Sequence, residues 1–98
     1  SAVWRMYMDE IKSYVVPDYI TYSKVDGEVV IFHGKNNHYY GLNDVGSSIF
    51  KKIESGKILD DIIQELSDEF NVEDQDELRK DVKEIISDLI SEGIIKEK

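Results

Sequence analysis

Few side chains in this sequence have the types and spacing that catalysis requires. The two histidines, His33 and His38, flank a turn and could face each other across it. Two imidazoles without a carboxylate at ligand spacing make a poor zinc site, so ordinary polar residues at strand ends are the better interpretation. The chain has no cysteine, which excludes thiol catalysis, thiolate metal sites and disulfides. We therefore expect no metal, no cofactor and no enzymatic activity.

The acidic pairs are better explained by helix capping than by acid–base catalysis. Asp60 and Asp61 stand where one helix is expected to begin, and Asp74, Asp76 and Glu77 stand where another is expected. Carboxylates at these positions stabilise the positive end of a helix dipole. No glycine-rich phosphate loop follows a predicted strand, and no serine lies in a nucleophile elbow.

The run His38–Gly46, with the sequence His-Tyr-Tyr-Gly-Leu-Asn-Asp-Val-Gly, carries the most information about function. Tyr39 and Tyr40 favour a half-buried strand, and Asn43 can cap a helix that begins directly afterwards. A short strand that ends where a helix begins is expected to be the last strand of a small sheet. Its outer edge would then be unpaired, and such an edge is either protected or used to bind another chain.

Three strands are predicted upstream of the helices. Tyr19–Val25 and Glu28–His33 are rich in β-branched and aromatic residues, and Asp26-Gly27 between them is a strong two-residue hairpin signal. A longer turn leads to the third strand, His38–Leu42. The prediction is an antiparallel meander.

The rest of the chain is predicted to be helical. Apolar residues recur at helical spacing over Asn43–Ile53, Ile58–Phe70 and Asp76–Ser91. Ile94 and Ile95 are expected to fold back onto the core as a short extended tail. The fold class is therefore α+β and winged-helix-like, a three-stranded antiparallel sheet followed by three helices.

The N-terminal residues are harder to interpret. Apolar residues recur there at helical spacing: Val3, Tyr7, Ile11 and Tyr14 or Val15. Pro17 then prevents a regular continuation of the helix. We expect an N-terminal extension over residues 1–18 and one domain over residues 19–98. No run approaches the roughly 20 apolar residues of a membrane span, and no signal peptide is recognisable, so a cytoplasmic protein is expected.

The charge disfavours nucleic acids and membranes as partners. The chain has 12 basic and 21 acidic residues, a net charge of −9, and most of the excess lies after residue 42. Phosphate backbones and anionic lipid surfaces would be repelled. A winged-helix protein reads DNA with a basic helix, but Asp76–Ser91 is net acidic despite Arg79, Lys80 and Lys83.

Peptide binding by strand addition fits these features better. An unpaired edge supplies main-chain donors and acceptors, and the third helix could form a pocket wall if it lies beside that edge. Tyr39 and Tyr40 are suitable anchors because aromatic side chains give contact area at low entropic cost. For each tyrosine taken alone, the sequence supports a role in the core and a role in a binding site equally.

Several segments together resemble the PqqD family, the RiPP recognition element that binds leader peptides in ribosomal peptide modification pathways. The likeness covers roughly residues 19–95 and is carried by the hairpin Val25–Phe32, by Tyr39–Gly46, by Ile53–Gly56, by Asp81-Val82 and by Leu89–Gly93. The size and acidity are most similar to PqqD itself or to the discrete recognition proteins of lasso-peptide pathways.

The resemblance implies that a precursor's leader peptide docks as a fourth antiparallel strand beside the third strand, in a groove walled by the third helix. It implies two sets of binding residues: His38, Tyr39, Tyr40 and Gly41 on the strand, and Leu78, Asp81, Val82 and Ile85 on the helix. It also implies a partner enzyme, either a leader protease or a radical SAM enzyme. Alternatives are a winged-helix module for transcription or protein–protein interaction, and a subunit that only stabilises a larger enzyme.

Two further expectations concern single residues. Val82 should wall both the groove and the core, whereas Asp81 should be partly buried at the groove mouth. The segment Tyr14-Val15-Val16-Pro17 has the Tyr-x-x-Pro spacing that lasso leader peptides use. Chance explains this spacing better than the alternative, in which the segment lies in its own groove or a neighbour's.

Overall fold

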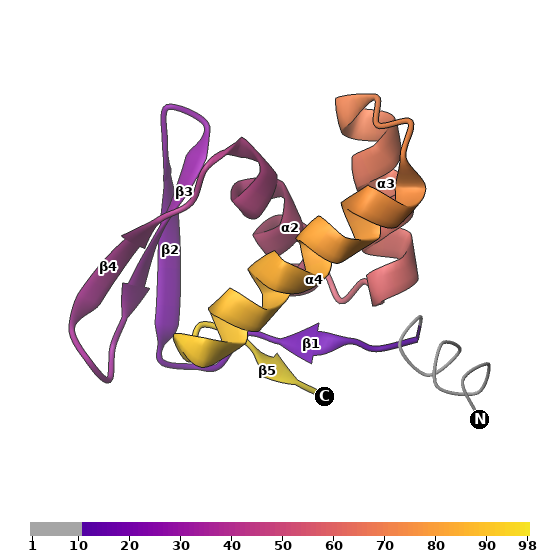
Figure 1. Cartoon of the computed structure of the whole chain (residues 1–98). Helices are drawn as coiled ribbons and strands as arrows, with labels where there is room; N and C mark the ends of the chain where they lie inside the picture. The colour runs from indigo at the N-terminus through magenta and orange to yellow at the C-terminus, as the bar shows by residue number, and fades with distance from the viewer. Residues whose placement is uncertain (1–10) are drawn as a thin grey trace.

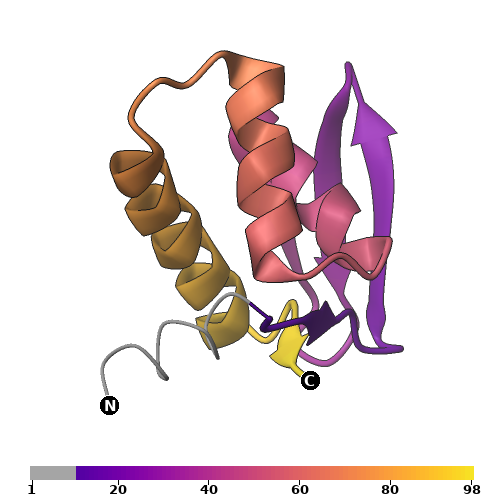
Figure 2. The same cartoon turned by 90° about the vertical axis from the view of Figure 1, so that its right-hand side faces the viewer.

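The computed structural model describes residues 11–98 as a three-stranded sheet with three helices packed on one of its faces (Figures 1 and 2). Among residues 11–98, no helix covers the other face of the sheet. The predicted α+β class is confirmed. The elements in chain order are β1 (Tyr14–Val15), β2 (Ile20–Val25), β3 (Glu28–His33), β4 (His38–Gly41), α2 (Asp44–Glu54), α3 (Leu59–Phe70), α4 (Gln75–Ser91) and β5 (Lys96–Glu97).

The main sheet is the predicted antiparallel meander, with strand order β2-β3-β4. Asp26 and Gly27 form the two-residue turn between β2 and β3 with φ of 52° and 83°. Both angles lie in the left-handed region that the turn requires, which glycine adopts freely and aspartate tolerates. The second turn pairs His33 with His38 across the start of β4, as their positions predicted.

The helix ends follow the capping signals. The side chain of Asn43 accepts a hydrogen bond from the Gly46 amide at 2.9 Å, and that of Asp74 accepts from the Glu77 amide at 3.1 Å. Asp60 and Asp61 lie in the first turn of α3, so the acidic pairs are at helix starts as predicted.

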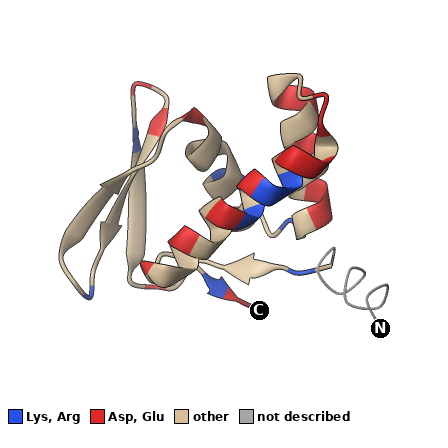
Figure 3. Cartoon of the chain, in the orientation of Figure 1, with Lys and Arg blue, Asp and Glu red and all other residues tan. Residues whose placement is uncertain are grey.

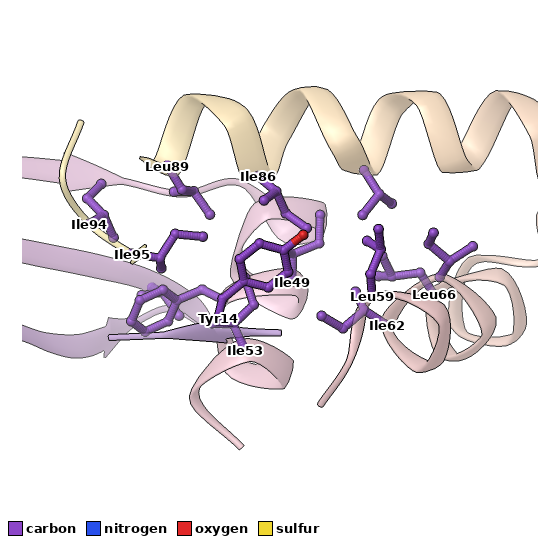
Figure 4. Close-up of a cluster of buried hydrophobic side chains, with 14 of the residues drawn as sticks. Tyr14, Ile49, Ile53, Leu59, Ile62, Leu66, Ile86, Leu89, Ile94 and Ile95 are labelled. Carbon is purple, nitrogen blue, oxygen red and sulfur yellow. The ribbon is translucent and has the colours of Figure 1, made fainter. Parts of the chain in front are cut away.

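One hydrophobic core joins the sheet to the helices (Figure 4). Phe50 and Ile49 of α2, Leu66 of α3 and Val82 of α4 are fully buried. Ile94 and Ile95 are buried as well, which confirms that the C-terminal tail folds back onto the core.

The start of the described chain differs from the prediction. Tyr14 and Val15, predicted at helical spacing, form β1 and pair with β5 in an antiparallel ladder. Tyr14 is only 5% exposed and lies among the core side chains between α4 and the other helices (Figure 4). The segment is extended and not helical because β5 pairs with it and the core accommodates the Tyr14 ring. Tyr14 therefore does not lie in its own groove beside β4, and that part of the interpretation of the Tyr-x-x-Pro spacing is wrong for this chain. Binding in a neighbour's groove stays a hypothesis.

Two other predictions concern the same region. Val3 and Tyr7 lie outside the described residues. The boundary after residue 18 stays a prediction, although the core draws on Tyr14, which is N-terminal to it. Within residues 11–98, the helices are too short or too polar to cross a membrane.

Candidate functional site

The outer edge of β4 carries main-chain groups that no neighbouring strand pairs. β4 is the last strand of the sheet, and the Leu42 amide donates to the Val29 carbonyl at 2.9 Å. Residues of an antiparallel pair alternate between bonding across the pair and pointing away from it. Since Leu42 and Tyr40 face β3, the N–H and C=O groups of Tyr39 and Gly41 point outward. The predicted open edge is confirmed for this strand.

Ser47 fixes the end of β4 that leads into α2. Its hydroxyl accepts from the Val29 amide at 2.9 Å and donates to the Leu42 carbonyl at 3.1 Å. The hydroxyl thus bridges β3 and the residue after β4, and Ser47 is 2% exposed. The first turn of α2 therefore holds the strand in register.

The two tyrosines of β4 have different environments. Tyr40 lies opposite the buried Ile31, is half-buried and packs against the core. Tyr39 lies on the uncovered face, is 72% exposed, and places its ring 4.9 Å from that of Phe32. Tyr40 thus has the core role and Tyr39 the surface role, a choice that the sequence left open.

The predicted residues of α4 range from fully buried to exposed. Val82 is fully buried, Leu78 is 9% exposed, and Ile85 is half-buried. Asp81 was expected to be partly buried but is exposed, because it lies one position round the helix from the buried stripe. Gly41 and His38 of β4 are exposed too.

A hydrogen bond joins α4 to β4 directly. The Tyr40 hydroxyl donates to Glu92 Oε2 at 3.1 Å and accepts from Asn36 Nδ2 at 3.3 Å. Gly93, just beyond α4, lies against the ring of His33 at the end of β3. The C-terminal end of α4 therefore lies beside the hairpin that contains β4. Glu92 was not among the predicted residues, although its spacing from Asp81 and Ile85 puts it on the same helix flank.

The other end of α4 lies farther from the sheet. Arg79 contacts Asp60 of α3 at 3.4 Å, and the helix runs diagonally from α3 towards the sheet (Figure 1). Leu78 and Asp81 are in this distant half, whereas Ile85 is nearer to β4. The structure thus brings only part of the predicted helix set close to the predicted strand set.

One hollow of the surface lies away from this edge. It measures about 450 Å³ and lies between the β2–β3 turn, α2 and α3, beside Lys52 and Glu69. A smaller hollow of about 300 Å³ lies on the sheet and is lined partly by Phe32 and Tyr39. Strand addition needs no deep cavity, because its affinity comes from main-chain hydrogen bonds.

One perturbed carboxyl group lies between α2 and α3. Lys52 Nζ and Ser48 Oγ contact Glu69 Oε1 at 2.9 and 2.7 Å and hold the pKa of Glu69 below its usual range. In α2, the carboxylate of Glu54 raises the pKa of Tyr22. Both shifts have a structural explanation in the packing of α2 and require no catalytic role.

The histidines form no metal centre with their described neighbours. His33 is buried, and its Nδ1 accepts from the amides of Lys35 and Asn36 at 3.2 and 3.4 Å, so the ring stabilises the turn. Over residues 11–98, no three His, Cys, Asp or Glu side chains gather at ligand distance.

The chain is similar to one known protein family and to two solved structures. The family model of coenzyme PQQ synthesis protein D (PqqD) matches residues 28–95. A structure of TbiB1 in complex with the TbiA(beta) leader peptide is 27% identical with a TM-score of 0.78, covering 83% of this chain and 93% of that chain. A lasso peptide synthetase B1 complexed with the leader peptide is 23% identical with a TM-score of 0.77, covering 86% and 98%, and shows the shared fold. No curated protein matches the chain.

Proposed function

Because the chain belongs to the PqqD family, we propose that it binds the leader peptide of a ribosomally synthesised precursor. The similar TbiB1 structure holds a leader peptide, and the two chains share their fold over most of their lengths. The observation that carries the proposal in this chain is the open edge of β4, which ends the sheet with the Tyr39 and Gly41 main-chain groups turned outward.

The proposed mode is addition of the leader as a fourth antiparallel strand beside β4. Tyr39 and Gly41 supply the main-chain hydrogen bonds, which give affinity without sequence preference. A side chain at Gly41 would meet no atom within 4 Å, so an approaching backbone has room there. His38 and Tyr40 contribute side-chain surface at the same edge.

The helix side of the proposed site supplies the specificity. Ile85 is half-buried and offers apolar surface, Val82 supports it from the core, and Asp81 offers an exposed carboxylate. Leu78 completes the proposed set but lies in the half of α4 that is farther from β4. We add Glu92 to the proposed set, because its carboxylate accepts a hydrogen bond from the Tyr40 hydroxyl.

We further propose that the protein is an adaptor without catalytic activity of its own. It would present the bound precursor to a modifying enzyme, either a leader protease or a radical SAM enzyme. The lack of cysteine in the chain and the capping role of its acidic pairs support this view.

An NMR titration tests the proposed edge. The probe is the TbiA(beta) leader peptide that the similar TbiB1 structure holds, added to the ¹⁵N-labelled chain. We expect the largest amide shifts at Tyr39–Leu42 and at Ile85–Glu92. Shifts concentrated instead on α3 or on β2, the other outer strand of the sheet, would contradict the proposed site.

A further inference from the structure

Most acidic side chains of α4 lie on one flank of the helix, whereas its bases and Asp76 project elsewhere. On this flank acidic side chains recur at helical spacing, and Ile85 lies among them. Its carboxylates are called the acidic row: Glu77, Asp81, Asp88 and Glu92. Arg79 and Lys83 project about 170° and 150° around the helix from the centre of this row, and Lys80 projects about 90° from it. Figure 3 marks the acidic residues of α4 in red and its basic residues in blue along the ribbon.

The acidic row is the flank turned towards β4. Glu92, its last member, accepts the Tyr40 hydroxyl of β4 at 3.1 Å. Arg79 on the opposite flank contacts Asp60 of α3 at 3.4 Å. These two contacts fix the rotation of the helix about its axis.

The acidic row is not neutralised by neighbouring bases. The ion pairs recorded within residues 11–98 use none of its carboxylates. Asp81 and Asp88 are exposed, and Ile85 between them is half-buried. The flank therefore combines a strip of apolar surface with unpaired negative charge, opposite a strand edge that has no partner.

We propose that the segment accepted at the β4 edge carries Arg or Lys at alternate positions, on the side that faces α4. This inference rests on the proposed function and names the class of peptide that the site selects. Only every second side chain of an added strand faces the helix, about 6.7 Å apart. Glu77 and Asp81 are separated by about 6 Å along the helix axis, as are Asp88 and Glu92, so each of these pairs is close to that repeat. The gap between Asp81 and Asp88 is longer, about 10.5 Å.

Long basic side chains suit this flank for two reasons. Their aliphatic stems can lie on Ile85 while their charged ends reach the carboxylates of Asp81 and Asp88. Arginine adds bidentate hydrogen bonding to a carboxylate, which an apolar or short polar side chain cannot supply.

A displayed library of random nine-residue peptides, selected against the full chain, supplies the probes. We expect the enriched peptides to carry Arg or Lys at alternate positions. Their binding should weaken about tenfold in the double variant Asp81→Asn/Asp88→Asn, since each lost contact is an exposed charge pair.

A matched double variant on α3, Asp61→Asn/Asp68→Asn, removes the same charge from exposed positions away from β4. Binding of the same peptides should stay within about twofold there, because these charges lie on α3 and not on the flank of α4 that faces β4. Equal losses in the two double variants would mean that only net charge matters, and would overturn the inference.

The amide shifts of Tyr39 and Gly41 separate failure of this inference from failure of the proposed function. If enriched peptides shift these amides but show no alternating bases, the inference is wrong and the proposed edge stands. If no peptide is enriched, or if the shifts lie elsewhere, both are wrong.

Discussion

At the scale of single residues, Asp81 and Val82 are adjacent in sequence but belong to different surfaces. Val82 is fully buried, whereas Asp81 is exposed on the flank of α4 that faces β4. A helix turns by about 100° per residue, so neighbouring positions can serve the core and the binding surface separately. Substitutions at these two positions should therefore affect different measurements.

We expect Val82→Ala to lower the free energy of unfolding by about 1–3 kcal/mol, because truncation leaves a cavity in the core. Asp81→Ala should change it by no more than about 0.5 kcal/mol, yet weaken leader binding by up to about 1 kcal/mol, because the charge pair that it removes is exposed. Thermal melts and peptide titrations of both variants measure these effects. Wild-type affinity in Asp81→Ala would remove Asp81 from the site.

Glu69 gives a prediction about pH. Its pKa is lowered by hydrogen bonds from Lys52 and Ser48, so these contacts stabilise the fold above the ordinary pKa of 4.5. That contribution is lost as the pH falls through the lowered pKa. In Lys52→Met the pKa of Glu69 should rise towards 4.5. The ¹³C chemical shift of the Glu69 carboxyl, followed as a function of pH, measures this pKa. The control is Lys57→Met, which removes the partner of Glu65 and should leave the pKa of Glu69 unchanged.

At the scale of elements, the sheet has two outer strands, and only one is proposed to bind. β4 has α4 on its helix side, with the Tyr40–Glu92 hydrogen bond between them. β2 forms the other edge, where Tyr22 packs its ring 5.1 Å from Phe50 and donates to Glu54. Proline substitutions distinguish the two edges, because proline removes a main-chain donor.

We expect Gly41→Pro to abolish peptide addition while the sheet stays folded, because the Gly41 N–H points away from β3. Lys24→Pro is the matched control. The Gly34 amide donates to the Tyr19 carbonyl, and by the same alternation the Lys24 N–H points away from β3 on the other edge. Circular dichroism reports the fold and fluorescence anisotropy reports binding. Loss of binding in Lys24→Pro with binding retained in Gly41→Pro would assign the peptide to β2.

At the scale of the whole molecule, the charge decides which partners can approach. The net charge is −9, and α4, which would be the reading helix of a DNA-binding winged helix, carries the acidic row. Phosphate contacts supply most of the affinity for DNA, and this surface opposes them. The same charge attracts basic peptides over a distance of about one Debye length.

Duplex DNA should therefore bind no better than about 10⁻⁴ M at physiological salt, the weak end of non-specific affinity. A gel-shift or anisotropy assay with mixed-sequence duplexes measures this. Micromolar and sequence-dependent binding would favour the transcriptional alternative over the leader-peptide adaptor.

The sequence alone determined the features that depend on neighbours along the chain. Asp26-Gly27 specified the hairpin, Asn43 and Asp74 specified helix starts, and the apolar spacing of α4 specified its buried stripe. Each depends on the conformational preference or hydrogen bonding of a few adjacent residues, so it can be predicted without knowing the rest of the fold. The open edge of β4 followed from the order of these elements.

Only the tertiary structure decided the features that depend on residues far apart in the chain. Tyr14 entered the core because β5, more than eighty residues later, supplied its strand partner. The register of β4 with β3 decided that Tyr40 packs against the core and that Tyr39 lies on the exposed face. Glu92 reached β4 because α4 crosses the molecule diagonally. Periodicity says which flank of a helix is polar, but packing against other elements fixes what that flank faces.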